Sequence, residues 1–318
     1  MLSSISPSDA VRQATRSLAL DVAAVEAIEA LSAAGIQSVL LKGRSIADWL
    51  YDDGTPRPYV DIDLLVDPGV EARAQDVLLN LGYGKNARDT IPFDRPPHCT
   101  LWVRGVGHTA LELHTTLVGV GAPRESVWRT LSSHKETLHV AGRPLPVLSP
   151  AAIAFQIALH AAQHGPTSPK ALEDLNRALK RVDFEGWRIA ASIAEGLDAI
   201  PAFGVGLRLD GEGVELADEL GLPSRPTVEL IIRSRGHSRG ALALDWLDAR
   251  PGVAFKARFL LRKIASPRRF IRDWDPRATR GPGALALAYV RRWIWLARET
   301  PGAIRDLRRA KREARWNP

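Results

Sequence analysis

Two aspartates, Asp61 and Asp63, lie two residues apart inside an apolar stretch that includes Ile62 and Leu64. Successive side chains of a strand point to opposite faces, so a strand here places both carboxylates on one face. Like charges held side by side repel unless a cation lies between them. Mg²⁺ suits this position because it takes oxygen ligands and is usually shared with substrate phosphates. An edge strand with a solvated acidic face explains this run equally well, and both interpretations stay open at this point.

A phosphate-binding turn is predicted upstream of the two aspartates. The apolar run 36–41 predicts a buried strand, and residues 46–51 have apolar side chains at helical spacing. A strand, a glycine-containing turn and a helix start together offer free backbone N–H groups to a phosphate. The candidate phosphate contacts are the four residues of this turn, Lys42, Gly43, Arg44 and Ser45. An ordinary strand-to-helix turn is the alternative.

These segments resemble a known family. The residues 40–43, Tyr51, Arg57 and 61–66 look like the uncharacterised bacterial branch of the polymerase-β-like nucleotidyltransferase superfamily. The superfamily pattern is a glycine with Gly or Ser at a helix start, then Asp-x-Asp or Asp-x-Glu on the next strand, and a third carboxylate from a later strand. The resemblance implies an α+β fold, in which a small mixed sheet with flanking helices precedes a mostly helical region. It also implies two Mg²⁺ or Mn²⁺ ions that carry a nucleoside triphosphate.

The chain departs from the superfamily pattern in the turn, because Arg44 separates Gly43 from Ser45. The interval from Gly43 to Asp61 is also longer than in the compact members. Both departures affect which residues grip the phosphates and leave the pair of aspartates unchanged.

Glu112 is the predicted third carboxylate. It lies between Leu111 and Leu113 in the alternating run 109–114, and the branch has a similar acid-x-His element after its Asp-x-Asp strand. The resemblance therefore implies that Glu112 completes the metal site and acts as the base that activates the acceptor; an exposed strand residue is the alternative. His114 shares the face of Glu112, where it either orients the substrate or packs as an ordinary histidine.

The resemblance also implies a reaction. Asp61 and Asp63 would both hold the nucleotide metal, and one of them would hold the second ion together with Glu112. Arg57, four residues before Asp61, is a candidate for neutralising the triphosphate. Two metals about 4 Å apart can clamp the attacking and leaving oxygens of an in-line displacement. The acceptor would attack the α-phosphorus and release pyrophosphate.

Two predicted helices after Pro150 add further candidates. The helix 151–163 carries His160, with His164 four residues on, and the helix 172–179 carries Asp174. Helices in the corresponding region of the branch close one side of the cleft, so His160 and Asp174 are possible substrate contacts. The two histidines lie on one helix face, but no glutamate separates them in the manner of zinc proteases. A salt bridge or a helix cap is the alternative for Asp174.

The remaining predicted elements define the organisation of the chain. Helices are predicted at 8–34 and 70–81, strands at 99–103, 109–114 and 140–148, and a polar, proline-rich loop at 85–98. The prolines at 144, 146 and 150 mark a boundary, which divides the chain into a catalytic domain, 1–148, and a helical, Arg/Trp-rich domain, 149–318.

Composition narrows the functional class. The 318 residues have a net charge of +7, which suits phosphate-rich ligands without proving them. Cys99 is the only cysteine, so an intramolecular disulfide and a thiolate metal cluster are excluded. No secretion signal and no apolar run of membrane-spanning length is recognisable, and we therefore expect a cytoplasmic protein without a transmembrane segment.

The C-terminal part alternates basic and aromatic residues, as at Phe255, Arg258, Phe259 and Arg262. Such a pattern binds nucleic acid through phosphate contacts and stacking, or an anionic membrane through an amphipathic helix. A helical bundle with its aromatic residues inside and its arginines outside is the favoured interpretation.

The acceptor stays open at this level. A small molecule, a sugar, or a peptide or protein side chain is the first interpretation. A toxin-like enzyme that acts on transfer RNA, a catalytically silent nucleotide-binding protein, and a kinase-like enzyme that transfers the γ-phosphate are the alternatives.

Overall fold

The computed structural model describes residues 7–85, 98–105, 109–140, 142–224, 226–234, 239–248 and 252–316. The proline-rich loop predicted at 85–98 lies almost entirely outside these residues. The strands are β1 (Ser38–Leu40), β2 (Asp61–Val66), β3 (Gly84–Lys85), β4 (Cys99–Arg104), β5 (Thr109–His114), β6 (Lys135–Val140) and β7 (Arg143–Leu148). The helices up to the end of the sheet are α1 (Pro7–Ala33), α2 (Arg44–Leu50), α3 (Glu71–Asn80) and α4 (Arg124–Ser133).

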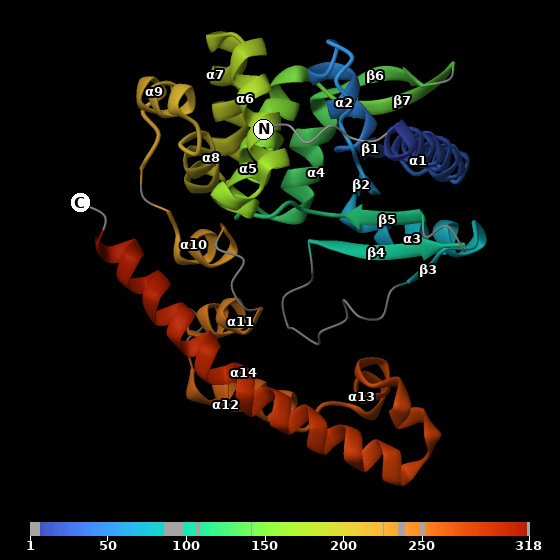
Figure 1. Ribbon diagram of the computed structural model, residues 1–318, viewed down its shortest axis with the longest axis vertical. Coiled ribbons are helices and arrows are strands. Elements are labelled where there is room, and N and C mark those ends of the chain that lie inside the picture. The colour runs from blue at the N-terminus through green and yellow to red at the C-terminus, as the bar shows by residue number, and fades with distance from the viewer. Residues whose placement is uncertain are drawn as a thin grey trace.

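Ten further helices follow the sheet in the described residues. They are α5 (Pro150–His164), α6 (Pro169–Arg181), α7 (Phe184–Gly196), α8 (Ile200–Leu207), α9 (Gly211–Glu219), α10 (Val228–Ser234), α11 (Arg239–Asp248), α12 (Val253–Ile264), α13 (Arg268–Trp274) and α14 (Pro282–Trp316). Figure 1 shows α5–α8 gathered beside the sheet and α12–α14 extending away from it. The α+β prediction, with a mixed sheet followed by a helical region, is confirmed.

The seven strands form one mixed sheet in the order β3-β4-β5-β2-β1-β7-β6. β2 runs parallel to β5 and antiparallel to β1, and β1 runs parallel to β7. The central strands β2 and β5 therefore lie side by side although 42 residues separate Val66 from Thr109 in the numbering. This pairing is what brings the carboxylate of one strand next to that of the other.

The alternation along β2 separates two apolar cores. Ile62 and Leu64 pack with α1 and α3 on one face of the sheet, while Leu65 packs on the other face with α5, α7 and α8. Asp61 and Asp63 share the face of Leu65 by the two-residue period of a strand. The core on this face contains residues of the sheet and of α5–α8, so it extends across the predicted domain boundary between residues 148 and 149. A division of the chain into two domains at that point stays a prediction.

The prediction of one strand over 140–148 is wrong in its start. Val140 ends β6, and β7 begins only at Arg143 and pairs back on β6 in an antiparallel hairpin. Gly142 has a φ of +78°, a left-handed conformation that glycine adopts at no steric cost and that suits the turn. Pro144 and Pro146 are tolerated because β7 pairs with β1 at Val147, beyond both prolines.

The contact between α8 and α5 offers a test of the packing. A Cβ at Gly206 would lie 1.9 Å from the backbone oxygen of Ala158, and backbone atoms cannot move aside cheaply. Gly206→Ala is therefore expected to lower the free energy of unfolding by about 1–3 kcal/mol, measured by urea denaturation. The matched control is Gly196→Ala in α7, where a Cβ meets nothing within 4 Å. It is expected to be neutral or slightly stabilising; equal losses in both variants would contradict the close packing of α8 on α5.

Candidate active site

The pairing of β2 with β5 sets Asp63 directly beside Glu112. Paired residues of neighbouring strands project to the same face, so both carboxylates face the side of the sheet that α5 covers. His114 follows two residues after Glu112 and shares this face. Asp61, at the start of β2, is paired with Ala110 and projects to the same side.

Two basic side chains neutralise the buried carboxylate of Asp63. Lys42 Nζ lies 2.8 Å from Asp63 Oδ1. His114 Nε2 lies 3.0 Å from the same oxygen and 3.3 Å from Glu112 Oε2. The side chains of His114 and Asp63 are 3% and 2% exposed, whereas that of Glu112 is 27% exposed and is the more accessible of the two carboxylates. The result is a compact cluster of Lys42, Asp63, Glu112 and His114, which we call the carboxylate cluster.

The charges of the carboxylate cluster shift the pKa values of its members. Burial alone would raise the pKa of Asp63, but the Lys42 ammonium and His114 outweigh it and lower the pKa of that carboxyl. The hydrogen bond from His114 lowers the pKa of Glu112. Burial opposes the protonation of His114, yet its contacts with the two carboxylates raise its pKa. Both acids are therefore held in the ionised form that a metal ligand needs.

Asp61 stands apart from this cluster. Burial and the nearby charge of Asp63 raise the pKa of the Asp61 carboxyl. Among the described residues, the potential ligand atoms of Asp63, Glu112 and His114 lie within 4.8 Å of one another, and Asp61 is not part of that group. An added cation between Asp61 and Asp63 would relieve the repulsion that raises this pKa.

The donor set fits a hard divalent cation. Asp61, Asp63 and Glu112 offer the carboxylate oxygens that Mg²⁺ and Mn²⁺ take as ligands. Lys42 and His114 supply positive charge at the place where such an ion would interact with Asp63. His114 Nδ1 is buried without a hydrogen-bond partner in the described part of the chain, so the histidine is held from its Nε2 side alone.

The predicted phosphate turn contributes Lys42 to this cluster. Gly43 precedes α2 with a φ of +71°, and the Ser45 hydroxyl is buried and donates to the carbonyl of Lys42 at 3.3 Å. Arg44 turns away, with its guanidinium 3.1 Å from Asp48 and 3.5 Å from Asp21. The turn therefore aims Lys42 at Asp63, while Ser45 holds the shape of the turn.

Arg57 and Asp174 form a buried ion pair with each other. The guanidinium donates from Nε and Nη2 to the two oxygens of Asp174 at 2.8 and 2.6 Å, and the Tyr51 hydroxyl donates to Asp174 Oδ1 at 2.7 Å. Arg57 Nη1 also reaches the carbonyl of Gly43 at 3.4 Å. The side chains of Arg57 and Asp174 are 2% and 1% exposed, so this geometry leaves neither free for a ligand. The salt bridge considered for Asp174 is what the structure contains, and it ties α6 to the turn.

The rings of His160 and His164 contact each other on one face of α5, with centroids 4.4 Å apart and planes tilted by 60°. Burial and the charge of Lys42 lower the pKa of His160 well below its usual value, and the same two causes lower that of His164. His160 therefore stays neutral beside the carboxylate cluster. Neither histidine belongs to a group of three potential metal ligands within the described residues.

Lys170 is a candidate site residue that the sequence pattern did not indicate. It lies in the first turn of α6, is half-buried, and has no hydrogen bond or ion pair to any described residue. Burial and the charge of Arg57 lower the pKa of its ammonium group, and the charges of Asp174 and Asp61 only partly oppose this shift. No local spacing distinguishes Lys170 from other helical lysines, because its position depends on the packing of α6 against α5 and α2.

Cys99 contributes a second unanticipated contact to the site. Its thiol lies 3.6 Å from Glu112 Oε2, to which it donates from the neighbouring strand β4. The pairing of Cys99 with His114 across β4 and β5 explains this proximity, since both project to the face of the site.

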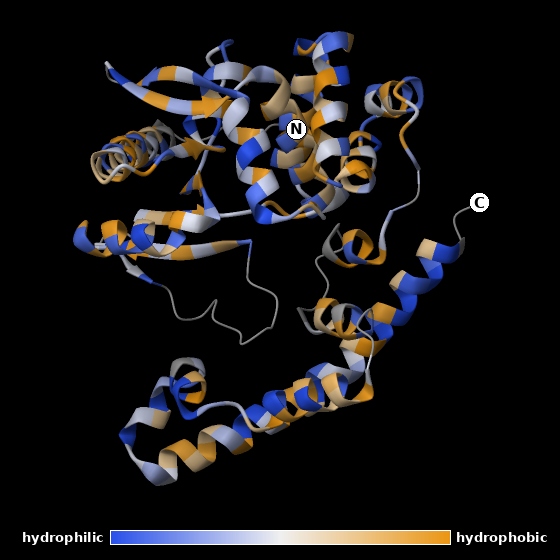
Figure 2. Cartoon of the chain, turned by 180° about the vertical axis from the view of Figure 1, so that it is seen from behind, coloured by the Kyte–Doolittle hydropathy of each residue, from blue (hydrophilic) through white to orange (hydrophobic). Residues whose placement is uncertain are grey.

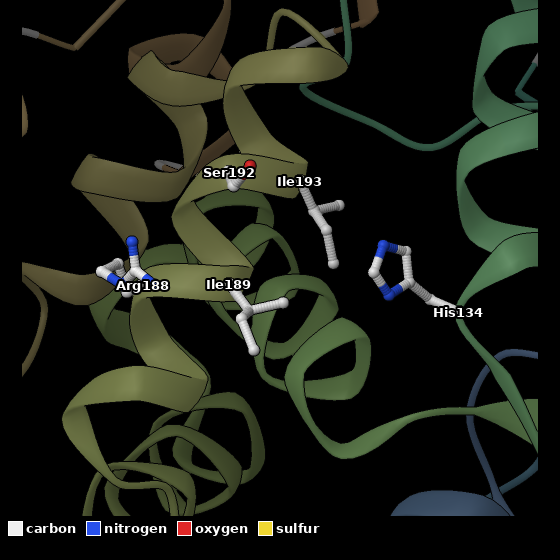
Figure 3. Close-up of a pocket in the computed structure, with 5 residues that line it drawn as sticks. All are labelled: His134, Arg188, Ile189, Ser192 and Ile193. Atoms are coloured by element: carbon white, nitrogen blue, oxygen red, sulfur yellow. The ribbon is translucent and has the colours of Figure 1, made fainter.

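Two pockets in the described residues do not contain the carboxylate cluster. A pocket of about 480 Å³ opens between α1 and α2, with Asp21, Arg44 and Tyr59 in its lining. A smaller one of about 190 Å³ lies between His134 and α7, where Ile189 and Ile193 face the imidazole across the gap (Figure 3). The smaller pocket has no carboxylate in its lining and therefore lacks ligands for a metal-bound phosphate.

Comparison with known proteins gives the family. Residues 8–210 match the sequence profile of a family described as uncharacterised nucleotidyltransferase. The chain belongs to this nucleotidyltransferase family. The resemblance noted in the sequence is confirmed, and the protein is a nucleotidyltransferase, an enzyme of the transferase class. The matched region contains every candidate site residue named above.

Two solved structures are similar to this nucleotidyltransferase. The antibiotic-resistance factor ANT(2'')-Ia, studied in solution, has 15% identity and a TM-score of 0.40. A crystallised antigenic nucleotidyltransferase-like protein from Paracoccidioides brasiliensis has 16% identity and a TM-score of 0.36. Each match covers 57% of this chain and 92% of the other. No curated protein matches the nucleotidyltransferase significantly. In the described residues, no helix has the length and apolar character that crossing a membrane requires.

Proposed function

We propose that the enzyme moves a nucleoside monophosphate group from a nucleoside triphosphate to an acceptor hydroxyl and releases pyrophosphate, with Mg²⁺ or Mn²⁺ as cofactor. The observation that carries the proposal is the register of β2 and β5, which sets Asp63 beside Glu112 with Asp61 on the same face. Three carboxylates on adjacent strands are a suitable ligand set for two divalent ions. The acceptor is a hydroxyl of a small molecule, a sugar, a peptide or a protein.

Each carboxylate has a proposed role in this reaction. Asp61 and Asp63 would hold the ion that accompanies the triphosphate, and Glu112, with one of them, the second. Bound ions would supply positive charge that stabilises the charge developing on the phosphate oxygens. Glu112, the most exposed member of the carboxylate cluster, is positioned to take the proton of the acceptor hydroxyl. That oxygen forms a bond to the α-phosphorus as the bond to the pyrophosphate oxygen breaks.

The lysines near Asp61 and Asp63 are the proposed phosphate contacts. Lys42 pairs with Asp63, and an ion at Asp63 would free its ammonium for a phosphate oxygen. Lys170 has no partner among the described residues, and a half-buried ammonium is costly without one. A triphosphate beside Asp61 would provide that partner. Gly43 and Ser45 shape the turn that would bind the same triphosphate. The ion pair of Arg57 and Asp174 stabilises this turn, because Arg57 also donates to the carbonyl of Gly43.

Lys170→Met is expected to raise the KM for the nucleoside triphosphate about tenfold or more, because a charge-assisted contact is lost. The kcat is expected to change less than the KM. Steady-state kinetics with varied triphosphate checks this, and Lys180→Met, an exposed lysine of the same helix, is the matched control. An unchanged KM in Lys170→Met would remove this lysine from the binding site.

Transfer of labelled phosphorus tests the proposed reaction directly. The enzyme is incubated with Mg²⁺ or Mn²⁺ and with triphosphates labelled at either the α- or the γ-phosphorus, and a host extract supplies the acceptors. Label from the α-position in a product, accompanied by pyrophosphate release, is the expected result. Sensitivity of that product to ribonuclease, together with the size of a transfer RNA, would assign transfer RNA as the acceptor.

Two other outcomes would overturn the proposal. Label from the γ-position alone would make the protein a kinase. Metal-dependent triphosphate binding without transfer of either label, across extracts from several growth conditions, would indicate a binding protein without turnover.

A further inference from the structure

The C-terminal arm, residues 252–316, lies outside the region that matches the nucleotidyltransferase family. It contains α12, α13 and α14, and Figure 1 shows these helices extending away from the sheet and from α5–α8. The family match therefore does not account for the arm.

An apolar stripe runs along two helices of the arm. Its members recur at helical spacing and are 43–84% exposed, although all are large and apolar. The stripe consists of Val253, Leu260, Leu261 and Ile264 from α12, and Leu287, Val290, Trp293 and Ile294 from α14. Figure 2 shows such apolar residues alternating with hydrophilic ones along the arm. Exposed apolar patches of this extent mark interaction surfaces.

The packing inside the arm leaves this stripe on the outside. The Trp293 indole donates to the carbonyl of Ile264 at 2.8 Å, so the α14 part of the stripe adjoins the last turn of α12. The opposite side of α14 is already in use, because Ala288 packs against α13 and Arg292 lies over the rings of Phe270 and Trp295. The favoured bundle with its aromatic residues inside holds for Phe259, which is buried, and fails for Trp293 and Trp295, which are 47% and 43% exposed.

The charge of the arm points to an anionic partner. Residues 252–316 carry 18 lysines and arginines and five aspartates and glutamates, a net charge of +13, while the preceding residues carry a net charge of −6. The face of the stripe continues along α14 into a basic segment, where Arg305, Arg308, Arg312 and Arg315 are all exposed. Apolar side chains followed by arginines on one helix face are typical of helices that lie in a membrane interface.

We propose that the arm docks on the surface of an anionic lipid bilayer, with the apolar stripe among the acyl chains and the arginines at the headgroups. An anionic bilayer accommodates both features, because apolar burial and headgroup attraction act together. Nucleic acid would satisfy the arginines but would leave valine, leucine and isoleucine side chains exposed. A second copy that paired arm to arm would bring two charges of +13 together, which repel each other.

Co-sedimentation of the full chain with vesicles tests the proposal. Neutral phosphatidylcholine vesicles are compared with vesicles in which part of that lipid is replaced by phosphatidylglycerol. The wild-type protein is expected to bind the anionic vesicles, weakly or not at all the neutral ones, and less at high salt. The variant Leu261→Glu/Ile294→Glu is expected to lose at least tenfold in affinity, and both positions are exposed, so the fold should tolerate it.

The matched control is Leu79→Glu, at a similarly exposed leucine of α3, and it is expected to bind vesicles like the wild type. Trp293→Phe adds a second readout, because lipids brominated in their acyl chains should quench less fluorescence in this variant. Absence of sedimentation with anionic vesicles, or equal binding by the stripe variant, would overturn the proposal. A dimer that forms without lipid and is lost in the stripe variant would instead assign the stripe to a second copy.

Discussion

Nucleotidyl transfer by the Asp63→Asn variant is expected to fall about 10³-fold or more below the wild type. Asparagine keeps the size of the side chain but removes the charge that Lys42 and His114 contact and that a metal ion would need. The assay is the release of pyrophosphate under saturating triphosphate and metal. Binding of the triphosphate in the presence of metal is expected to weaken as well.

The stability of the Asp63→Asn variant needs its own measurement. Removing this carboxylate leaves the part-buried Lys42 without its ion-pair partner and the buried His114 with Glu112 alone, so the free energy of unfolding should fall by about 1–3 kcal/mol. Glu112→Gln is the companion variant, because its more exposed side chain should cost less stability and still lose activity. Asp76→Asn, an exposed acid on α3, is the matched control and should retain full activity. Transfer within tenfold of wild type in Asp63→Asn would exclude this carboxylate from catalysis.

Arg57→Met is expected to lower the free energy of unfolding by about 3–5 kcal/mol, because it leaves Asp174 charged and buried without its partner. Equilibrium urea denaturation measures the loss. The double variant Arg57→Met/Asp174→Leu removes both charges, and much of the stability should return. A non-additive result of this kind is the signature of a direct pair.

The matched control for Arg57→Met is Arg181→Met. Arg181 pairs with Asp52 at 2.7 Å on the surface, where solvent screens such pairs and they contribute little to stability. Triphosphate affinity separates the two roles considered for Arg57. If Arg57→Met loses triphosphate affinity but keeps its stability, Arg57 contacts the triphosphate, as predicted from the sequence. If Arg57→Met loses stability and the double variant keeps its triphosphate affinity, the ion pair is structural and connects α6 to the Gly43 turn.

The elements that hold the candidate site were predictable because their patterns are local. The strand at Asp61–Val66 and the strand at Thr109–His114 both follow from alternation, and α2 follows from helical spacing after a glycine. Alternation along each strand also predicts that Asp61 and Asp63 share a face. Whether these residues carry the chemistry assigned to them remains a prediction.

The contacts between distant segments were not predictable, because no local period encodes them. Arg57 meets Asp174 across 117 residues, and Lys170 reaches the site only through the packing of α6. A single sequence shows that the two charged residues are present but not that their side chains lie in contact. The hairpin of β6 and β7 was missed for a different reason. Its two prolines suggest a break in the strand, but at both prolines β7 pairs with β6 alone, so the sheet tolerates them.

The division of charge between the arm and the rest of the chain makes the molecule an electric dipole. A net charge of +13 on residues 252–316 and −6 on the preceding residues would turn the protein in the field of a negatively charged surface. The arm would arrive first, and the acidic end would be repelled. Such steering would hold the carboxylate cluster toward the aqueous side, where nucleoside triphosphates are dissolved, before any apolar side chain reached the lipid.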